Sequence, residues 1–94
     1  MELEFQFSDN RYFAKNDEGK VIAEVTFPKK SDLVIDLNHT FVDDSLRGQG
    51  VAGKLVRMVC EYASENNLKI KPTCSYAAKW LESHEEFKAL VDNS

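Results

Sequence analysis

Three closely spaced glycines mark the part of the sequence that is best suited to hold an anion. Glycine permits a tight backbone turn and lets a ligand approach the backbone amides. Where such a turn opens a helix, the first N–H groups of the helix lack partners within it and attract negative charge, helped by the helix dipole. We therefore expect a phosphate or pyrophosphate site in the segment Leu46-Arg47-Gly48-Gln49-Gly50-Val51-Ala52-Gly53-Lys54.

The alternative without a ligand is a tight turn in which Gly53 only packs close to a strand. Two common phosphate-binding motifs also fit the segment, but each fits incompletely. Gly48, Gly50 and Gly53 have the spacing of a dinucleotide fingerprint, which normally lies in the first βαβ unit of a much larger sheet. A P-loop needs Ser or Thr to hold magnesium at the position where this chain has Leu55, which counts against an NTPase.

The elements that position this loop follow from the spacing of apolar residues. Alternating apolar and polar residues predict strands at 3–7, 11–15, 21–27, 33–42 and 68–74, and short connections favour an antiparallel meander up to residue 42. From Val51 the apolar spacing becomes helical and predicts a main helix over 51–66, with short helices at 76–81 and 85–91.

This order predicts an α/β (α+β) fold: a mixed, mostly antiparallel sheet of five strands with one main helix and short C-terminal helices. The fourth strand, the main helix and the fifth strand form one βαβ unit, whose right-handed crossover makes the two strands parallel. The glycine loop then lies at the carboxyl end of the fourth strand, where mixed sheets usually bind ligands.

Composition and charge narrow the classes of function. The 94 residues are 43% hydrophobic and 30% charged, so we expect one globular domain over residues 1–94. A net charge of −4 argues against nucleic-acid or membrane surfaces as partners. Cys60 and Cys74 lack metal-ligand spacing, and no metal site is expected. Without an apolar span or signal peptide, we expect a cytoplasmic monomer.

A third pattern, Arg/Gln-x-x-Gly-x-Gly/Ala, is matched fully by residues 47–52. It resembles the pyrophosphate loop of the GNAT acetyltransferase superfamily, and its position after a β-meander and before a long helix strengthens the resemblance. The chain resembles the small, single-domain GNAT-like proteins of the YjdJ type, which have a truncated form of the fold without the first strand and the two helices by which larger members usually grip their acceptor. The resemblance is carried by this loop, by Asn38-His39-Thr40-Phe41-Val42 and by Lys71-Pro72-Thr73-Cys74-Ser75-Tyr76.

The resemblance implies that the chain binds acetyl-CoA or coenzyme A. The backbone of Phe41 and Val42 would pair with the pantetheine arm, and Gly53 and Lys54 would lie near the pyrophosphate. The pyrophosphate itself would lie on the backbone amides of Arg47, Gly48, Gln49, Gly50, Val51 and Ala52. The thioester would sit where the fourth and fifth strands splay apart, with Arg57, Lys71 and Lys79 as further candidates for the phosphates.

Two residues at the expected splay could carry acetyl transfer. His39 suits a general base because histidine titrates near neutral pH, although it could equally be a plain sheet-surface residue. Cys74 could accept the acetyl group and pass it on, or be a small packed residue without chemistry. Tyr76 is a candidate acid toward the leaving thiolate, and Trp80 is expected in the core.

These observations lead to two hypotheses of different classes. The first is an N-acetyltransferase that moves an acetyl group from acetyl-CoA to an amine, such as a lysine of a protein or peptide; the acceptor itself is unknown. The second is a non-catalytic module that binds or senses coenzyme A or acyl-CoA. The enzyme needs His39 and Cys74 at the thioester, whereas the binding module needs only the glycine loop.

Overall fold

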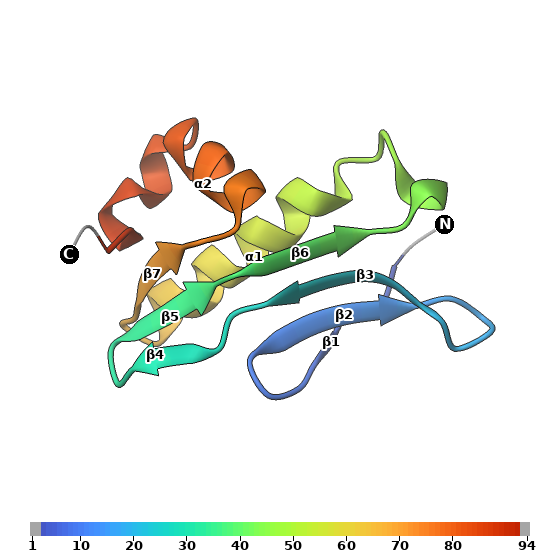
Figure 1. The fold of residues 1–94 in the computed structure, drawn as a ribbon, viewed down its shortest axis with the longest axis horizontal. Coiled ribbons are helices and arrows are strands. Elements are labelled where there is room, and N and C mark those ends of the chain that lie inside the picture. The colour runs from blue at the N-terminus through green and yellow to red at the C-terminus, as the bar shows by residue number, and fades with distance from the viewer. Residues whose placement is uncertain (1–2, 93–94) are drawn as a thin grey trace.

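The computed structural model describes residues 3–92, which form two small sheets and a layer of helices (Figure 1). The first sheet has four strands in the order β1-β2-β3-β6, and all neighbours are antiparallel. Its members are β1 (Gln6–Phe7), β2 (Arg11–Lys15), β3 (Val21–Thr26) and β6 (His39–Val42). The expected meander is therefore confirmed.

The second sheet has three strands in the order β4-β5-β7. Its members are β4 (Lys29–Ser31), β5 (Val34–Leu37) and β7 (Lys69–Pro72). The β7 strand lies parallel to β5, with Ile35 opposite Ile70. This confirms the parallel βαβ unit, and Pro72 ends an edge strand as the missing N–H of proline requires.

The single five-stranded sheet that the sequence predicts is divided into these two sheets. The expected strand 33–42 is two strands, β5 and β6, which are joined at Asn38 and pair with different neighbours. Side-chain and backbone contacts fix the break, because the Thr26 hydroxyl donates to Asn38 Oδ1 and the Asn38 amide donates to the Thr26 carbonyl. The polar segment β4 also pairs with β5, where the sequence suggested only a connection.

The main helix α1 (Val51–Glu65) packs on one face of both sheets and contacts β3, β6 and β7. Its apolar stripe supplies about a third of the buried core cluster, including Leu55, Val56 and Val59, which are fully buried in the same cluster as Val25 and Phe27. The expected end of the helix is confirmed within a residue: Asn66 caps it and donates its side-chain amide to the Tyr62 carbonyl.

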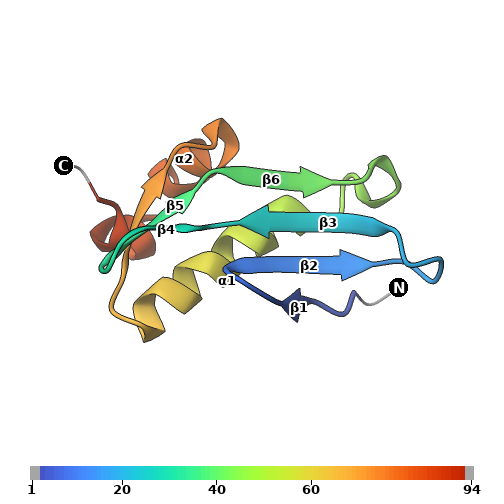
Figure 2. The same ribbon diagram turned by 60° about the horizontal axis from the view of Figure 1, so that its bottom comes forward.

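The remaining helical segments are η1 (Asp44–Leu46), α2 (Ser75–Glu82) and η2 (Glu85–Leu90). Two of them are 3-10 turns, so the expected helix at 85–91 is the tighter form. Figure 2 looks onto the face of the four-stranded sheet that lies opposite α1, which runs behind it. None of the helices within residues 3–92 is long and apolar enough to cross a membrane.

Candidate functional site: the glycine loop and the sheet opening

The glycine loop takes backbone conformations that require glycine. Gly48 has a φ of 81° and Gly50 a φ of 71°, in the left-handed region that other residues rarely enter. An added Cβ at either position would meet no atom within 4 Å. The space in front of the loop is thus open, and the glycines are needed for the turn and the approach rather than for internal packing.

The same loop opens α1 without using the first amides of the helix. Gly50 is the N-cap residue, and the helical hydrogen bonds begin with the Lys54 amide donating to the Gly50 carbonyl at 3.1 Å. Among the hydrogen bonds described for residues 3–92, the amides of Val51, Ala52 and Gly53 donate to no protein group. No acidic side chain occupies the first turn of α1. These free donors and the helix dipole favour an anion here.

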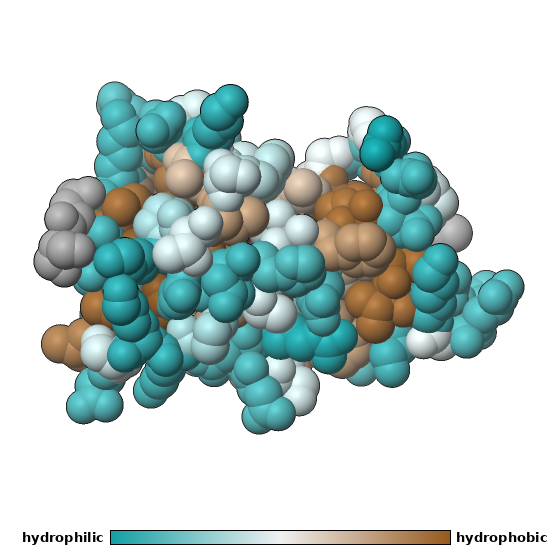
Figure 3. All heavy atoms as spheres, viewed as in Figure 1, coloured by the Kyte–Doolittle hydropathy of each residue, from teal (hydrophilic) through white to brown (hydrophobic). Residues whose placement is uncertain are grey.

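A pocket of about 310 Å³ lies directly in front of these amides. It brings together most of the residues that the sequence predicts for the cofactor, and adds Leu46 and Tyr76. Its lining consists of Val42, Leu46, Arg47, Gly48, Gly50, Val51, Ala52, Gly53 and Tyr76. Figure 3 shows apolar side chains gathered over the end of β6 beside this loop. The pocket therefore offers an apolar wall and a polar floor of amides.

Three predicted cofactor residues lie outside this lining. Gln49 lines a neighbouring pocket of about 410 Å³ together with Asn16 and Asp43. Lys54 points its ammonium at the ring of Phe5, 5.4 Å from the ring centroid. Phe41 is 39% exposed and, by its register with Glu24, lies on the sheet face opposite α1. Only the backbone of Phe41 was expected to contact the cofactor.

Acidic residues shape the start of the loop. Asp43 caps η1 by accepting hydrogen bonds from the backbone amide and hydroxyl of Ser45, and these bonds hold the pKa of Asp43 below its usual value. Arg47 forms an exposed ion pair with Asp44 at 3.0 Å. Because such exposed pairs are weak, Arg47 remains available to an anionic ligand at little cost.

The two sheets separate at Leu37. Its carbonyl accepts hydrogen bonds from both the Thr73 and the Cys74 amides, at 3.1 and 3.0 Å, which ends the parallel ladder between β5 and β7. Beyond this point the chain continues as β6 on one side and turns into α2 on the other. The expected splay therefore exists, and it opens towards the glycine loop.

The splay leaves one edge of β6 without a strand, since β6 is the last strand of its sheet. The Asp43 amide donates to the Ile22 carbonyl at 2.8 Å, and antiparallel bonding to one neighbour recurs at every second residue. Phe41 therefore bonds towards β3, and the backbone groups of Thr40 and Val42 face the open edge. Of the two residues expected to pair with a ligand arm, Val42 has the free backbone groups.

Cys74 lies at this opening as the N-cap residue of α2. Its sulfur lies 3.5 Å from the Thr40 hydroxyl. Partial burial on its own would raise the pKa of the Cys74 thiol, but hydrogen bonding from the Thr40 hydroxyl and from the amides of Ala77 and Tyr76 brings the pKa below its ordinary value. A thiol so placed is the more nucleophilic of the two cysteines. Burial raises the pKa of Cys60 to about 12.

His39 lies on the opposite face of β6 from Thr40, because successive side chains of a strand alternate. Its imidazole is half-exposed, and Nε2 lies 3.5 Å from Glu24 Oε1 on the neighbouring strand β3. Among the hydrogen bonds and ion pairs of residues 3–92, Cys74 pairs with Thr40 and His39 pairs with Glu24. The two candidate catalytic residues thus flank the opening from opposite faces of the sheet.

Sequence reasoning missed Thr40 and Glu24. Both look like ordinary polar positions of a strand, and only the pairing of three strands reveals what they contact.

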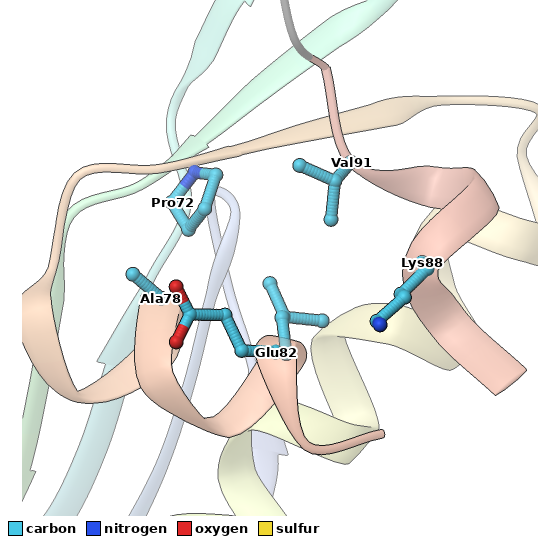
Figure 4. Close-up of a pocket in the computed structure, with 6 residues that line it drawn as sticks. Pro72, Ala78, Glu82, Lys88 and Val91 are labelled. Atoms are coloured by element: carbon cyan, nitrogen blue, oxygen red, sulfur yellow. The ribbon is translucent and has the colours of Figure 1, made fainter. Parts of the chain in front are cut away.

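A further pocket of about 300 Å³ lies between β7, α2 and η2, lined by Pro72, Ala78, Leu81, Glu82, Lys88 and Val91 (Figure 4). Residues 3–92 contain no group of three or more His, Cys, Asp or Glu side chains that could hold a metal ion.

Comparison with known proteins identifies the family of this fold. A family model described as GCN5-related N-acetyl-transferase matches residues 11–90. Among curated sequences, Protein NATD1 of Homo sapiens is 35% identical over 51 residues, which is 54% of this chain and 45% of the human protein. The corresponding protein of Gallus gallus matches equally, over 46% of its length. The aligned part thus spans less than half of these relatives.

Solved structures give the same result over more of the chain. The solution structure of a GCN5-like protein from Staphylococcus aureus superimposes with a TM-score of 0.82 and 37% identity, covering 98% of this chain and 90% of that one. Escherichia coli YhbS, an N-acetyltransferase solved in complex with CoA, superimposes with a TM-score of 0.56 and 29% identity, over 66% of this chain and 38% of its own. The chain belongs to the GCN5-related N-acetyltransferase family.

Proposed function

We propose that this protein transfers the acetyl group of acetyl-CoA to an amine, with a lysine of a protein or peptide as the acceptor class. The observation that carries the proposal is the pocket at the start of α1, where three free amides face an open, glycine-lined space. Family membership supports acetyl transfer in general. The acceptor class rests on the exposure of His39, whose side chain is half-exposed on the sheet face opposite α1 and so within reach of a side chain on a larger molecule.

The residues present fit coenzyme A. Its pyrophosphate needs donors and a close backbone, which the amides of Val51, Ala52 and Gly53 and the open space at Gly48 and Gly50 supply. Its pantetheine arm needs an extended edge with free backbone groups, which β6 offers at Val42, while the Thr40 amide next to it is hydrogen-bonded to the Cys74 sulfur. When bound, acetyl-CoA supplies the acetyl group as an activated thioester.

In this proposal the two sides of the opening have separate duties. His39 takes the proton from the acceptor ammonium on the exposed sheet face. Cys74 lies on the same side of the sheet as Thr40, and its lowered pKa favours the thiolate. This thiolate either acts on the thioester only through its charge or accepts the acetyl group before the amine does. Tyr76, whose side chain lines the pocket, is the candidate donor of a proton to the departing sulfur.

The separation of His39 and Cys74 also supports a second candidate function. A protein that only binds or senses coenzyme A needs the loop pocket and nothing from either residue. Mass spectrometry of the intact protein after mixing with acetyl-CoA separates the cases. Retained cofactor with acetylation of added peptide lysines supports the enzyme, retained cofactor without turnover supports the binding module, and no retained cofactor refutes both.

Coenzyme A binding at the loop has its own test. Wild-type protein should bind acetyl-CoA with micromolar affinity in calorimetry, or roughly 7–9 kcal/mol. Gly50→Val should remove the binding, because a branched side chain would fill the open space at a residue with positive φ. Gly19→Val is the matched control, since Gly19 also has positive φ, at 82°, but lies in the β2–β3 turn. Equal affinity of folded Gly50→Val and Gly19→Val would refute the loop assignment.

A further inference from the structure

The sheet face opposite α1 carries a row of three charged or titratable side chains from three different strands. Arg11 on β2, Glu24 on β3 and His39 on β6 share this face, because Arg11 and His39 are both opposite Thr26 in the register. Glu24 is two residues from Thr26 along β3, so it lies on the same face, diagonally between them. The row ends at the imidazole, beside the opening between the sheets.

Glu24 is held between its two neighbours. The Arg11 Nε donates to Glu24 Oε2, and Glu24 Oε1 faces His39 Nε2 at 3.5 Å. The guanidinium of Arg11 is itself fixed over the ring of Phe13, with its Cζ 4.0 Å from the ring centroid. The Glu24 side chain is 22% exposed, whereas that of His39 is 52% exposed. The better-buried carboxylate therefore has a fixed position from which it can orient a more mobile ring.

We propose that Glu24 is a positioning residue that orients His39 for proton transfer, with Arg11 fixing the carboxylate; this rests on the function proposed above for His39. With Nε2 turned towards Glu24, the ring nitrogen that remains open is Nδ1. Neutral imidazole has one donor and one acceptor nitrogen, so an Nε2–H facing the carboxylate leaves the Nδ1 lone pair to act as base.

The proton transfer balances without any further reagent. One N–H bond of the acceptor ammonium breaks, its electron pair stays on the amine nitrogen, and the proton forms a new bond to Nδ1 of His39. The resulting imidazolium directs its Nε2–H at the Glu24 carboxylate, whose negative charge stabilises the new positive charge. An acidic partner on the exposed face thus suits a base that becomes cationic during each turnover.

The first test needs no ligand and measures the conformation of the His39 side chain by NMR. The two Hα–Hβ couplings of His39 differ when χ1 is held near 180° or −60°, the rotamers common in strands, and converge when rotamers average. We expect distinct couplings in the wild type and converged couplings in Glu24→Ala. Glu65→Ala, a substitution of an exposed residue at the end of α1, is the matched control and should leave them distinct. Distinct couplings in Glu24→Ala would overturn the proposal.

The second test is a double-mutant cycle in peptide acetylation. Glu24→Ala should lower kcat by roughly 10- to 100-fold, less than the roughly 10²- to 10⁴-fold expected for loss of the base, and should leave CoA affinity unchanged. In a His39→Ala background the same substitution should have no further effect, and Glu24→Asp should restore part of the rate. A merely structural role would lower the rate equally in both backgrounds, which would overturn the proposal.

The cycle also distinguishes two failures. If His39→Ala acetylates peptides at the wild-type rate, the role of His39 is wrong, and the role of Glu24 falls with it. If His39→Ala is slow but Glu24→Ala is as fast as the wild type, His39 remains the base and only the positioning by Glu24 is refuted.

Discussion

Substitution of Gly53 tests whether α1 and α2 are packed as closely as the structure shows. Gly53 lies in the first turn of α1, and an added Cβ would lie 2.9 Å from Trp80 Nε1. Trp80 cannot easily withdraw. Its ring stacks on His84 with 3.5 Å between centroids, and the guanidinium of Arg57 lies 5.5 Å from the ring centroid. Gly53→Ala therefore forces a shift of a fixed indole.

The sign of the effect follows from two opposing contributions. Alanine favours a helix over glycine by about 1 kcal/mol, whereas overpacking a close contact costs about 1–3 kcal/mol. We expect a net loss of about 1 kcal/mol in the free energy of unfolding, which for a chain of this size lowers Tm by about 4–8 °C. Relief of the contact in a Trp80→Phe background should make Gly53→Ala neutral or stabilising.

The assay is thermal and urea unfolding of the four proteins of this cycle, followed by circular dichroism. A coupling of about 1–3 kcal/mol between positions 53 and 80 would agree with the contact. If Gly53→Ala stabilised the protein with Trp80 intact, the helix preference would be acting alone, and the close approach of α1 and α2 would be refuted.

Three further predictions concern the loop and the opening. Cys74 should react with iodoacetamide at a lower pH than an ordinary thiol, while Cys60 stays unmodified in the folded protein; equal labelling of the two in mass spectra would contradict the assigned environments. Thr40→Val removes a hydrogen bond to the Cys74 sulfur and should move the midpoint of this labelling to higher pH, and an unmoved midpoint would show that the bond is unimportant. Folding lowers the pKa of Asp43, so the stabilisation by its bonds to Ser45 is fully present above the unfolded pKa of about 3.9 and is lost as the pH falls through the folded pKa. The wild type should therefore be more stable to urea than Asp43→Asn at pH 7 but not near pH 2.

The sequence allowed the main helix, the loop and the order of strands to be predicted because each depends on local signals. The helix predicted from Val51 to Asn66 agrees with α1 to within one residue. At Asn38 the signal was weaker: the apolar alternation changes phase after Leu37, but residues 33–42 still read as one strand, because the break depends on which neighbours β5 and β6 find. Pairing partners far away in the chain are a tertiary property.

The candidate site shows the same division. The glycine pattern was sufficient to predict a loop that opens a helix, and the structure adds the pocket in front of it. The face on which His39 lies depended on a register that the sequence could not provide, because a shift by one residue reverses every side chain of a strand. Arg11, Glu24 and His39 come together from three strands, so no spacing in the sequence relates them.

The division of the sheet has a consequence for how activity can change through substitutions far from the site. The two edges of the opening belong to different sheets, which are joined by Asn38 and spanned by α1. The packing of α1 on both sheets therefore sets the distance between β6, which carries His39, and the segment that carries Cys74. Changes of volume at its buried positions, such as Leu55 or Val56, would widen or narrow that gap without touching either residue. Selection for a larger or smaller acceptor can thus operate on the hydrophobic core.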